Sequence, residues 1–304
     1  MKKMIVLLLL VSHLYIQAYH QAGGTNYTEQ GVHAYAVSRH GVDGALFLDP
    51  YFMPFLENVK DLTLLDAGCG VGPWSLYAAQ HGAHVYGIDI QDGMIQRARQ
   101  EAQEQGLDSI TFEVGTVAHL PYADNFFDRA VSINVGCNLP QDIFVAHFKE
   151  LYRVLKPGGA VVITAPANFA TVFSTLEAER DAREKITSLL ANIHDEKSLV
   201  EQIGALSSIL RATIINRDNN FYLLSDEDAL QEGDAIWRKI PGLVVPNYYH
   251  TQESYVCAAQ DAGFTISMIH RPQFDTLDDF RDSTSGLGIS YYFKYPFVIF
   301  YLSK

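Results

Sequence analysis

A glycine-rich segment and an aspartate that closes the following apolar run have the residue types of a nucleoside-binding site. Glycines stand at positions 68, 70 and 72, directly after an apolar run, and the next apolar run ends at Asp89. Glycine lets the backbone approach a ligand closely, because it lacks a Cβ atom and tolerates positive φ. An aspartate carboxylate can accept hydrogen bonds from two ribose hydroxyls at once. This order of strand, glycine loop, helix and strand with a terminal carboxylate is typical of a nucleoside-cofactor site on a doubly wound sheet.

The spacing of the glycines and a second carboxylate distinguish between nucleoside ligands. The spacing is G-x-G-x-G, and Asp66 lies two positions before Gly68. The nicotinamide pattern is G-x-G-x-x-G, because that loop admits a pyrophosphate at a helix N-terminus. A carboxylate beside the loop would repel a pyrophosphate and would suit a ligand that carries an amine and no phosphate. S-adenosylmethionine, with its sulfonium, amino acid and ribose groups, is such a ligand.

Other segments of the chain extend this pattern in a consistent order. They are Val85–Ile90 with Met94 and 97–99, His119–Tyr122 with Asp124, Phe127 and Asp128, the run Glu150–Gly159, and Asp261–Phe264. With the glycine loop, they resemble the class I S-adenosylmethionine-dependent methyltransferases, in the small-molecule, methyltransferase type 11-like branch that includes quinone-biosynthesis enzymes. The resemblance is strong over residues 60–168 and weaker toward the C-terminus. It implies S-adenosyl-L-methionine as the cofactor and methylation of a small-molecule substrate.

The order of apolar runs and helical segments predicts a doubly wound, mostly parallel, seven-stranded Rossmann-like sheet with an inserted helical cap after strand five. We expect strands over 62–66, 84–89, 110–114, 127–134, 159–165, 264–270 and 297–302, and helices over 74–80 and 91–105. Ligands bind outside the carboxyl ends of the strands in such sheets. Asp66, Asp89, Thr116 and Asn134 all fall at those ends.

Four regions follow from this pattern. Residues 1–22 are signal-like or anchor-like, 23–60 form an N-terminal helical segment, 61–168 and 251–304 form the methyltransferase core, and 169–250 are an inserted cap or substrate region. The insertion could cover the substrate pocket, or it could be a structural or dimerisation subdomain. We favour a cover, because a pocket at the strand ends needs a roof that excludes water. The oligomeric state stays open.

The resemblance assigns the cofactor to the residues at the strand ends. They are Asp66, Gly68, Cys69, Gly70, Asp89, Ile90, Thr116, Val117 and Asn134. Asp89 would accept from the ribose diol, and Asp66 would orient the loop and the methionine amino group. We expect Cys69 to be a small packing residue rather than a nucleophile. The family commonly has an aspartate at the position of Thr116, where it accepts from the adenine amino group, so this chain departs from the pattern there.

The expected reaction is an in-line displacement at the sulfonium methyl group, for which the protein mainly supplies proximity and alignment. A general base is needed only if the nucleophile loses a proton. His40, His119, Tyr249 and His250 are candidates, and the sequence identifies no catalytic residue among them. The segment 134–137 lacks the N-P-P-aromatic motif of enzymes that methylate nucleobase amines.

The composition of the chain disfavours some classes of substrate and ligand. The formal net charge of −13 and the pI of about 5.2 disfavour a nucleic-acid substrate, because phosphate backbones bind basic surfaces. The three cysteines have no metal-ligand spacing, so no metal site is expected, and their odd number fits no closed disulfide framework. Free thiols favour a reducing compartment.

The N-terminal sequence conflicts with a reducing compartment, because it resembles an export signal. Lys2 and Lys3 precede a short apolar run, as in a signal peptide, and the run is short for a membrane span. We therefore expect a cytoplasmic protein, with residues 4–16 as a candidate membrane contact, or an exported one if this segment is cleaved.

Two alternative functions stay open at this point. The first is an NAD-dependent oxidoreductase, against which the glycine spacing and Asp66 argue. The second is a non-catalytic cofactor-binding or effector protein, for which Thr116 and the unusual N-terminus leave room.

Overall fold

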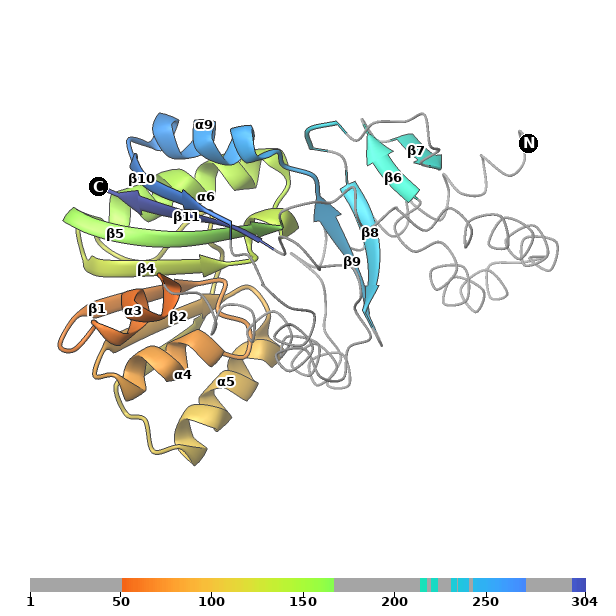
Figure 1. Cartoon of the computed structure of the whole chain (residues 1–304). Coiled ribbons are helices and arrows are strands. Elements are labelled where there is room, and N and C mark those ends of the chain that lie inside the picture. Colours follow the sequence, from red (N-terminus) through yellow and green to blue (C-terminus); the bar gives the residue numbers. More distant parts are fainter. Residues whose placement is uncertain are drawn as a thin grey trace, which may run out of the picture.

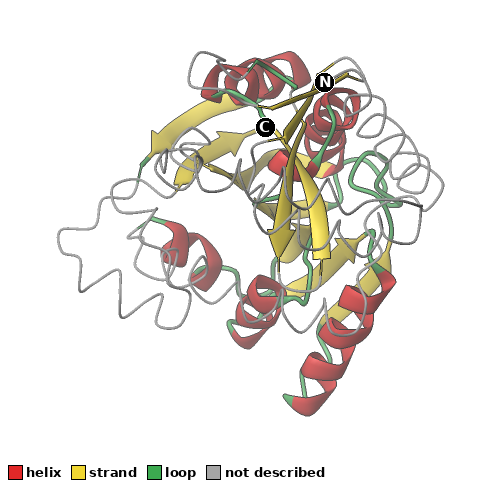
Figure 2. Cartoon of the chain, turned by 90° about the vertical axis from the view of Figure 1, so that its right-hand side faces the viewer, coloured by secondary structure: helices red, strands yellow, loops and turns green. Residues whose placement is uncertain are grey.

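The architecture is a seven-stranded sheet with helices on both faces (Figures 1 and 2). The computed structural model describes residues 51–166, 214–217, 220–223, 231–233, 235–240, 243–271 and 297–304. The strands of the large sheet are β1 (Thr63–Ala67), β2 (His84–Asp89), β3 (Ile110–Val114), β4 (Phe127–Ile133), β5 (Leu155–Pro166), β10 (Thr265–His270) and β11 (Phe297–Ser303). Their order is β10-β11-β5-β4-β1-β2-β3, and β11 runs antiparallel to both of its neighbours. The predicted mostly parallel, doubly wound sheet is confirmed.

Five helices of the described residues pack on this sheet, and the two predicted over 74–80 and 91–105 are confirmed within one residue at each end. The five are α3 (Phe52–Glu57), α4 (Pro73–Gln80), α5 (Asp92–Glu104), α6 (Gln141–Val154) and α9 (Gln252–Ala262), with a 3₁₀ turn, η1 (Gly136–Asn138). Pro73 occupies the first turn of α4, where its missing N–H leaves no helical bond unmade. Thr251 caps α9 by accepting from the Ser254 backbone N–H.

Alternation along the strands divides the core between the two faces of the sheet. Leu64 packs with α3 and α4, whereas the next residue, Leu65, packs with α6 and α9. Phe52 and Trp74 meet edge to face on the first side, and Tyr255 stacks on Phe300 on the second. In Figure 1, α6 and α9 lie side by side near the upper strands of the sheet, whereas α3 lies beside β1 and α4 and α5 lie below it. Because both faces are covered, a ligand would have to approach the sheet at the ends of the strands.

The described part of the insertion is a second sheet. Strands β6 (Ile214–Arg217), β7 (Asn220–Leu223), β8 (Ala235–Ile240) and β9 (Leu243–Tyr248) pair antiparallel in the order β7-β6-β8-β9. The expected helical cap is therefore wrong for these residues, and residues 169–213 lie outside the described part. The runs are short and bounded by turn-forming residues such as Pro241-Gly242, a pattern that fits strands better than helices.

The described residues contain no helix that is both long enough and apolar enough to cross a bilayer. The predicted membrane contact through residues 4–16, and most of the expected N-terminal helical segment, lie outside them.

Candidate cofactor site

Four polar residues follow neighbouring strands at one edge of the large sheet. Asp66 lies near the end of β1, Asp89 ends β2, Thr116 follows β3, and Asn134 follows β4. These strands are adjacent in the order β4-β1-β2-β3, and all four are parallel. Their carboxyl ends therefore meet at the same edge, and the topology brings the four predicted residues to one rim.

The glycine loop folds tightly against β2. The backbone N–H groups of Gly68 and Cys69 both donate to the Ile88 carbonyl, at 2.7 and 3.0 Å. Gly68 has φ of 79°, and a Cβ atom built on it would lie 2.4 Å from Cγ2 of Val135. Gly70 also has positive φ. The loop can hold this conformation only with glycine at its closest approach.

Asp89 is fixed at the rim by the backbone on both sides of it. Its Oδ2 accepts from the Gly70 N–H and its Oδ1 from the Gln91 N–H, each at 2.9 Å. Both carboxylate oxygens are therefore held in place before any ligand binds. The neighbouring Ile90 is about half exposed, which leaves an apolar side chain beside the carboxylate.

The second carboxylate is inside the protein. Asp66 is buried, and its Oδ2 accepts from the Ser75 hydroxyl of α4 at 2.7 Å. Burial, together with the negative charges of Asp66 and Asp89, raises the pKa of the Cys69 thiol well above its usual value. A thiol that stays protonated is a poor nucleophile, so this environment agrees with a packing role for Cys69.

The loop after β3 is held from the interior by a histidine that the sequence analysis did not single out. Nδ1 of His147, on α6, lies 3.4 Å from the Val117 carbonyl, and its Nε2 lies 2.9 Å from the Ser132 hydroxyl. The Thr116 hydroxyl accepts from the Ala118 N–H at 3.2 Å. The only sequence signal for His147 is a histidine within the apolar stripe of an amphipathic helix, and that pattern alone does not separate it from ordinary packing.

Acid should weaken the fold through His147. Burial lowers its pKa from the usual 6.5 to about 4, so the unfolded chain takes up the proton first as the pH falls. Neutral His147 contributes fully to the free energy of unfolding above pH 6.5. This contribution is lost as the pH falls toward 4, and the loss amounts to about 3 kcal/mol in total. Urea titrations at pH 7 and pH 4.5 should show this loss in the wild type and a smaller loss in H147N. Equal losses in both proteins would contradict the assignment.

Asn134 connects the end of β4 to the inserted sheet. Its backbone has φ of 55°, its N–H donates to the Thr164 hydroxyl at 2.9 Å, and that hydroxyl lies 3.3 Å from its Oδ1. Nδ2 of Asn138 donates to the Asn134 carbonyl, and Nδ2 of Asn247, on β9, donates to Oδ1 of Asn138, both at 2.7 Å. A strained backbone held by several partners is common at functional sites.

Two candidate bases lie in the polar contacts between the insertion and the core. His250 is buried, with Nδ1 at 2.6 Å from Oε1 of Glu232 and Nε2 at 2.8 Å from the Leu139 carbonyl, and its ring stacks on Phe144. Because both ring nitrogens face acceptors, this geometry suits a structural link rather than a general base. The Tyr249 carbonyl accepts from the Gly233 N–H.

Of the other candidates, His119 is exposed at the turn before Leu120, and His40 lies outside the described residues.

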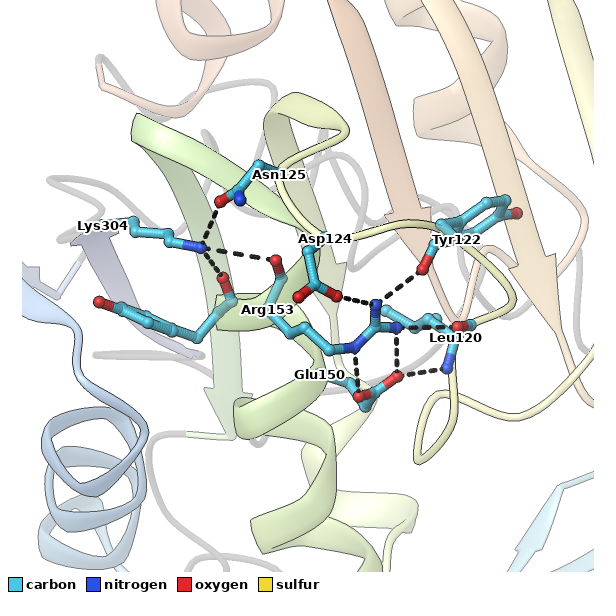
Figure 3. A network of polar contacts seen from close by, with 8 residues as sticks. Leu120, Tyr122, Asp124, Asn125, Glu150, Arg153 and Lys304 are labelled. Atoms are coloured by element: carbon cyan, nitrogen blue, oxygen red, sulfur yellow. Dashed lines mark hydrogen bonds and ion pairs between the residues drawn. The ribbon is translucent and has the colours of Figure 1, made fainter.

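Arg153 joins two of the segments that carry the resemblance (Figure 3). Its guanidinium donates to both oxygens of Glu150, to Asp124, and to the carbonyls of Leu120 and Tyr122, at 2.7–2.9 Å. Glu150 in turn accepts from the Leu120 N–H at 2.7 Å. The bonds from Arg153 hold the pKa of Glu150 below its usual value. This network fixes the chain directly after the loop 116–118 onto α6.

Replacing Arg153 by methionine should lower the free energy of unfolding by about 2–4 kcal/mol, because several charge-assisted bonds and two backbone carbonyls lose their donor. Methionine keeps much of the apolar stem, so the loss reports on the guanidinium. The matched control is R97M, which removes an exposed pair with Glu101 and should change stability by less than about 1 kcal/mol. Urea denaturation measures both. Similar losses in the two variants would show that the network is an ordinary surface contact.

Comparison with known proteins agrees with this geometry. Residues 64–159 match a family model described as a methyltransferase domain. Over 117 residues the chain is 44% identical to 24-methylenesterol C-methyltransferase 2 of Oryza sativa subsp. japonica, covering 35% of this chain and 31% of that protein. Over 170 residues it is 29% identical to the arsenite methyltransferase of Halobacterium salinarum, covering 55% and 42%. The matched stretch thus spans less than half the length of either relative.

Among solved structures, the chain resembles an S-adenosylmethionine-dependent methyltransferase from Mesorhizobium loti, with a TM-score of 0.53 and 19% identity. The similarity covers 85% of this chain and 100% of that one. At this level of identity, the likeness supports the fold of the large sheet and its helices.

Proposed function

We propose that the protein is a class I methyltransferase that transfers the methyl group of S-adenosylmethionine to a small molecule, because residues 64–159 match a methyltransferase-domain family model. The observation that carries the proposal is Asp89, held at the rim by two backbone N–H groups beside a glycine loop with no room for a side chain at Gly68.

The residues at this rim fit the chemical groups of the cofactor. A carboxylate has about four acceptor positions, so Asp89 can keep its two backbone donors and still accept from a ribose diol. No lysine or arginine lies between residues 61 and 80, and Asp66 lies just before the loop. This charge pattern suits an amine-bearing ligand without a pyrophosphate and disfavours NAD.

When bound, the cofactor supplies an electrophilic methyl group on its sulfonium, and the residues of the chain bind and align the reactants. Asp89 and the glycine loop would hold the ribose side, and the loop 116–118 would lie against the adenine. We place Asn134, which Thr164 fixes, on the side from which the acceptor would approach. Alignment and exclusion of water account for most of the rate that such a displacement needs from the protein.

The acceptor is proposed only as a small molecule. The two relatives carry names of chemically unrelated acceptors, a sterol and arsenite, so similarity does not favour one class. The inserted sheet contacts η1 through the Asn247–Asn138 bond, directly after Asn134. This contact supports the insertion as the part of the chain that covers the acceptor.

Transfer of a labelled methyl group tests the proposal. The purified full chain, incubated with S-adenosylmethionine labelled in its methyl group and a low-molecular-weight metabolite extract, should place label in a new small product. D89A should abolish the transfer. If the wild type binds S-adenosylhomocysteine but transfers no label to any pool, the chain is a cofactor-binding protein without turnover, and the proposal fails.

A further inference from the structure

The peptide between Val117 and Ala118 is held at both of its polar atoms. Its carbonyl oxygen faces Nδ1 of His147 at 3.4 Å, and its N–H donates to the Thr116 hydroxyl at 3.2 Å. Val117 is buried, and it lies one strand away from Asp89 along the rim. The loop therefore has a fixed backbone plane on the side where the proposed function places the adenine.

The partners of His147 determine its tautomer. A carbonyl oxygen can only accept, so Nδ1 carries the proton, and Nε2 must then accept from the Ser132 hydroxyl. Ser132 and His147 are both buried, on β4 and α6. Burial disfavours the charged imidazolium, so the ring is neutral. The neutral tautomer with the proton on Nδ1 satisfies both contacts.

We propose that His147 is a positioning residue for adenine recognition, which sets the loop 116–118 through the Val117 carbonyl without touching the cofactor. This inference rests on the proposed function. It goes further by separating two parts of the candidate cofactor site: the ribose side depends on Asp89 and the glycine loop, and the base side depends on a buried contact from α6.

Two substitutions separate the two bonds of His147. The amide nitrogen of asparagine can take the place of Nδ1 and donate to the Val117 carbonyl, whereas glutamine reaches the level of Nε2 and Ser132. We expect H147N to bind S-adenosylhomocysteine within about threefold of the wild type. H147Q should bind it about tenfold more weakly, since one hydrogen bond that orders the loop is lost. H147L also lacks a donor to the Val117 carbonyl and should bind as weakly as H147Q. If only one of these two variants folds, that variant can still be compared with H147N and the wild type.

A ligand that lacks the adenine distinguishes a positioning role of His147 from a general disturbance of the cofactor site. S-ribosylhomocysteine keeps the ribose and the amino acid but has no adenine, and NMR titration can follow its binding even at millimolar affinity. H147Q or H147L should leave this affinity unchanged within about twofold while weakening S-adenosylhomocysteine. Thermal melts establish that each variant is folded.

Equal weakening of both ligands, or unchanged binding of S-adenosylhomocysteine in the glutamine and leucine variants, would overturn the assignment of His147. If the wild type binds neither ligand, the proposed function fails first, and the inference falls with it.

Discussion

Replacing Asp89 by alanine should lower the affinity for S-adenosylhomocysteine at least about 100-fold. Two hydrogen bonds from ribose hydroxyls to a charged acceptor are lost, which corresponds to about 3 kcal/mol or more. The same substitution also removes the acceptor of the Gly70 and Gln91 N–H groups, so the loop loses its anchor on the ligand side. Isothermal titration calorimetry measures the affinity, and circular dichroism checks the fold.

The control for Asp89 is D108A, which removes the same charge from an exposed aspartate in the turn before β3. That turn lies at the opposite end of the parallel strands from the site, so D108A should bind S-adenosylhomocysteine as the wild type does. Wild-type affinity in a folded D89A would show that the ribose is held elsewhere.

Replacing Gly68 by alanine should lower the free energy of unfolding by about 2–4 kcal/mol and remove detectable cofactor binding. A Cβ atom in the left-handed region costs about 1–2 kcal/mol. The remainder comes from overpacking, because the added atom would lie 2.4 Å from Cγ2 of Val135. Since Gly68 donates to the Ile88 carbonyl, any shift that relieves the contact moves the loop away from β2.

Two further variants separate strain from overpacking. Gly106 has a similar φ, 67°, but a Cβ atom there would meet nothing within 4 Å, so G106A should show the strain alone, about 1–2 kcal/mol. The double variant G68A/V135A removes Cγ2 and should be less destabilised than the two single losses added together. If G68A is no less stable than G106A in urea denaturation, the close approach to Val135 is not a constraint.

The large sheet follows closely from local sequence pattern. Runs such as 84–89 and 110–114 alternate with helical segments, and this alternation leaves a parallel sheet as the simple solution. Glycine, proline and aspartate mark the ends of these elements, so their bounds could be predicted within a few residues. The placement of Asp66, Asp89, Thr116 and Asn134 at one edge needed only the rule that parallel strands share their carboxyl ends.

The insertion and the interior contacts could not be predicted in this way. Residues 214–248 contain short apolar runs, for which periodicity does not separate a strand from part of a helix. His147 occupies a position where an amphipathic helix would carry any apolar residue, and its partners Ser132 and Val117 are far away in sequence. Such contacts exist only after α6 has packed on the sheet.

The contacts of Arg153 also could not be predicted, although the motif that contains it is visible in the sequence. The segments around Leu120 and Glu150 were both identified from their residues, but their connection through one guanidinium required the folded chain. In the structure, the motif is therefore a polar network that fixes the chain after the loop 116–118.

A crystal structure of the full chain with S-adenosylhomocysteine would show how the rim of the large sheet holds the cofactor. We expect both ribose hydroxyls within hydrogen-bonding distance of the Asp89 carboxylate, the amino acid end beside the glycine loop, and the adenine against the loop 116–118. A ribose bound away from Asp89, or binding of NAD at this rim with no binding of S-adenosylhomocysteine, would contradict this expectation.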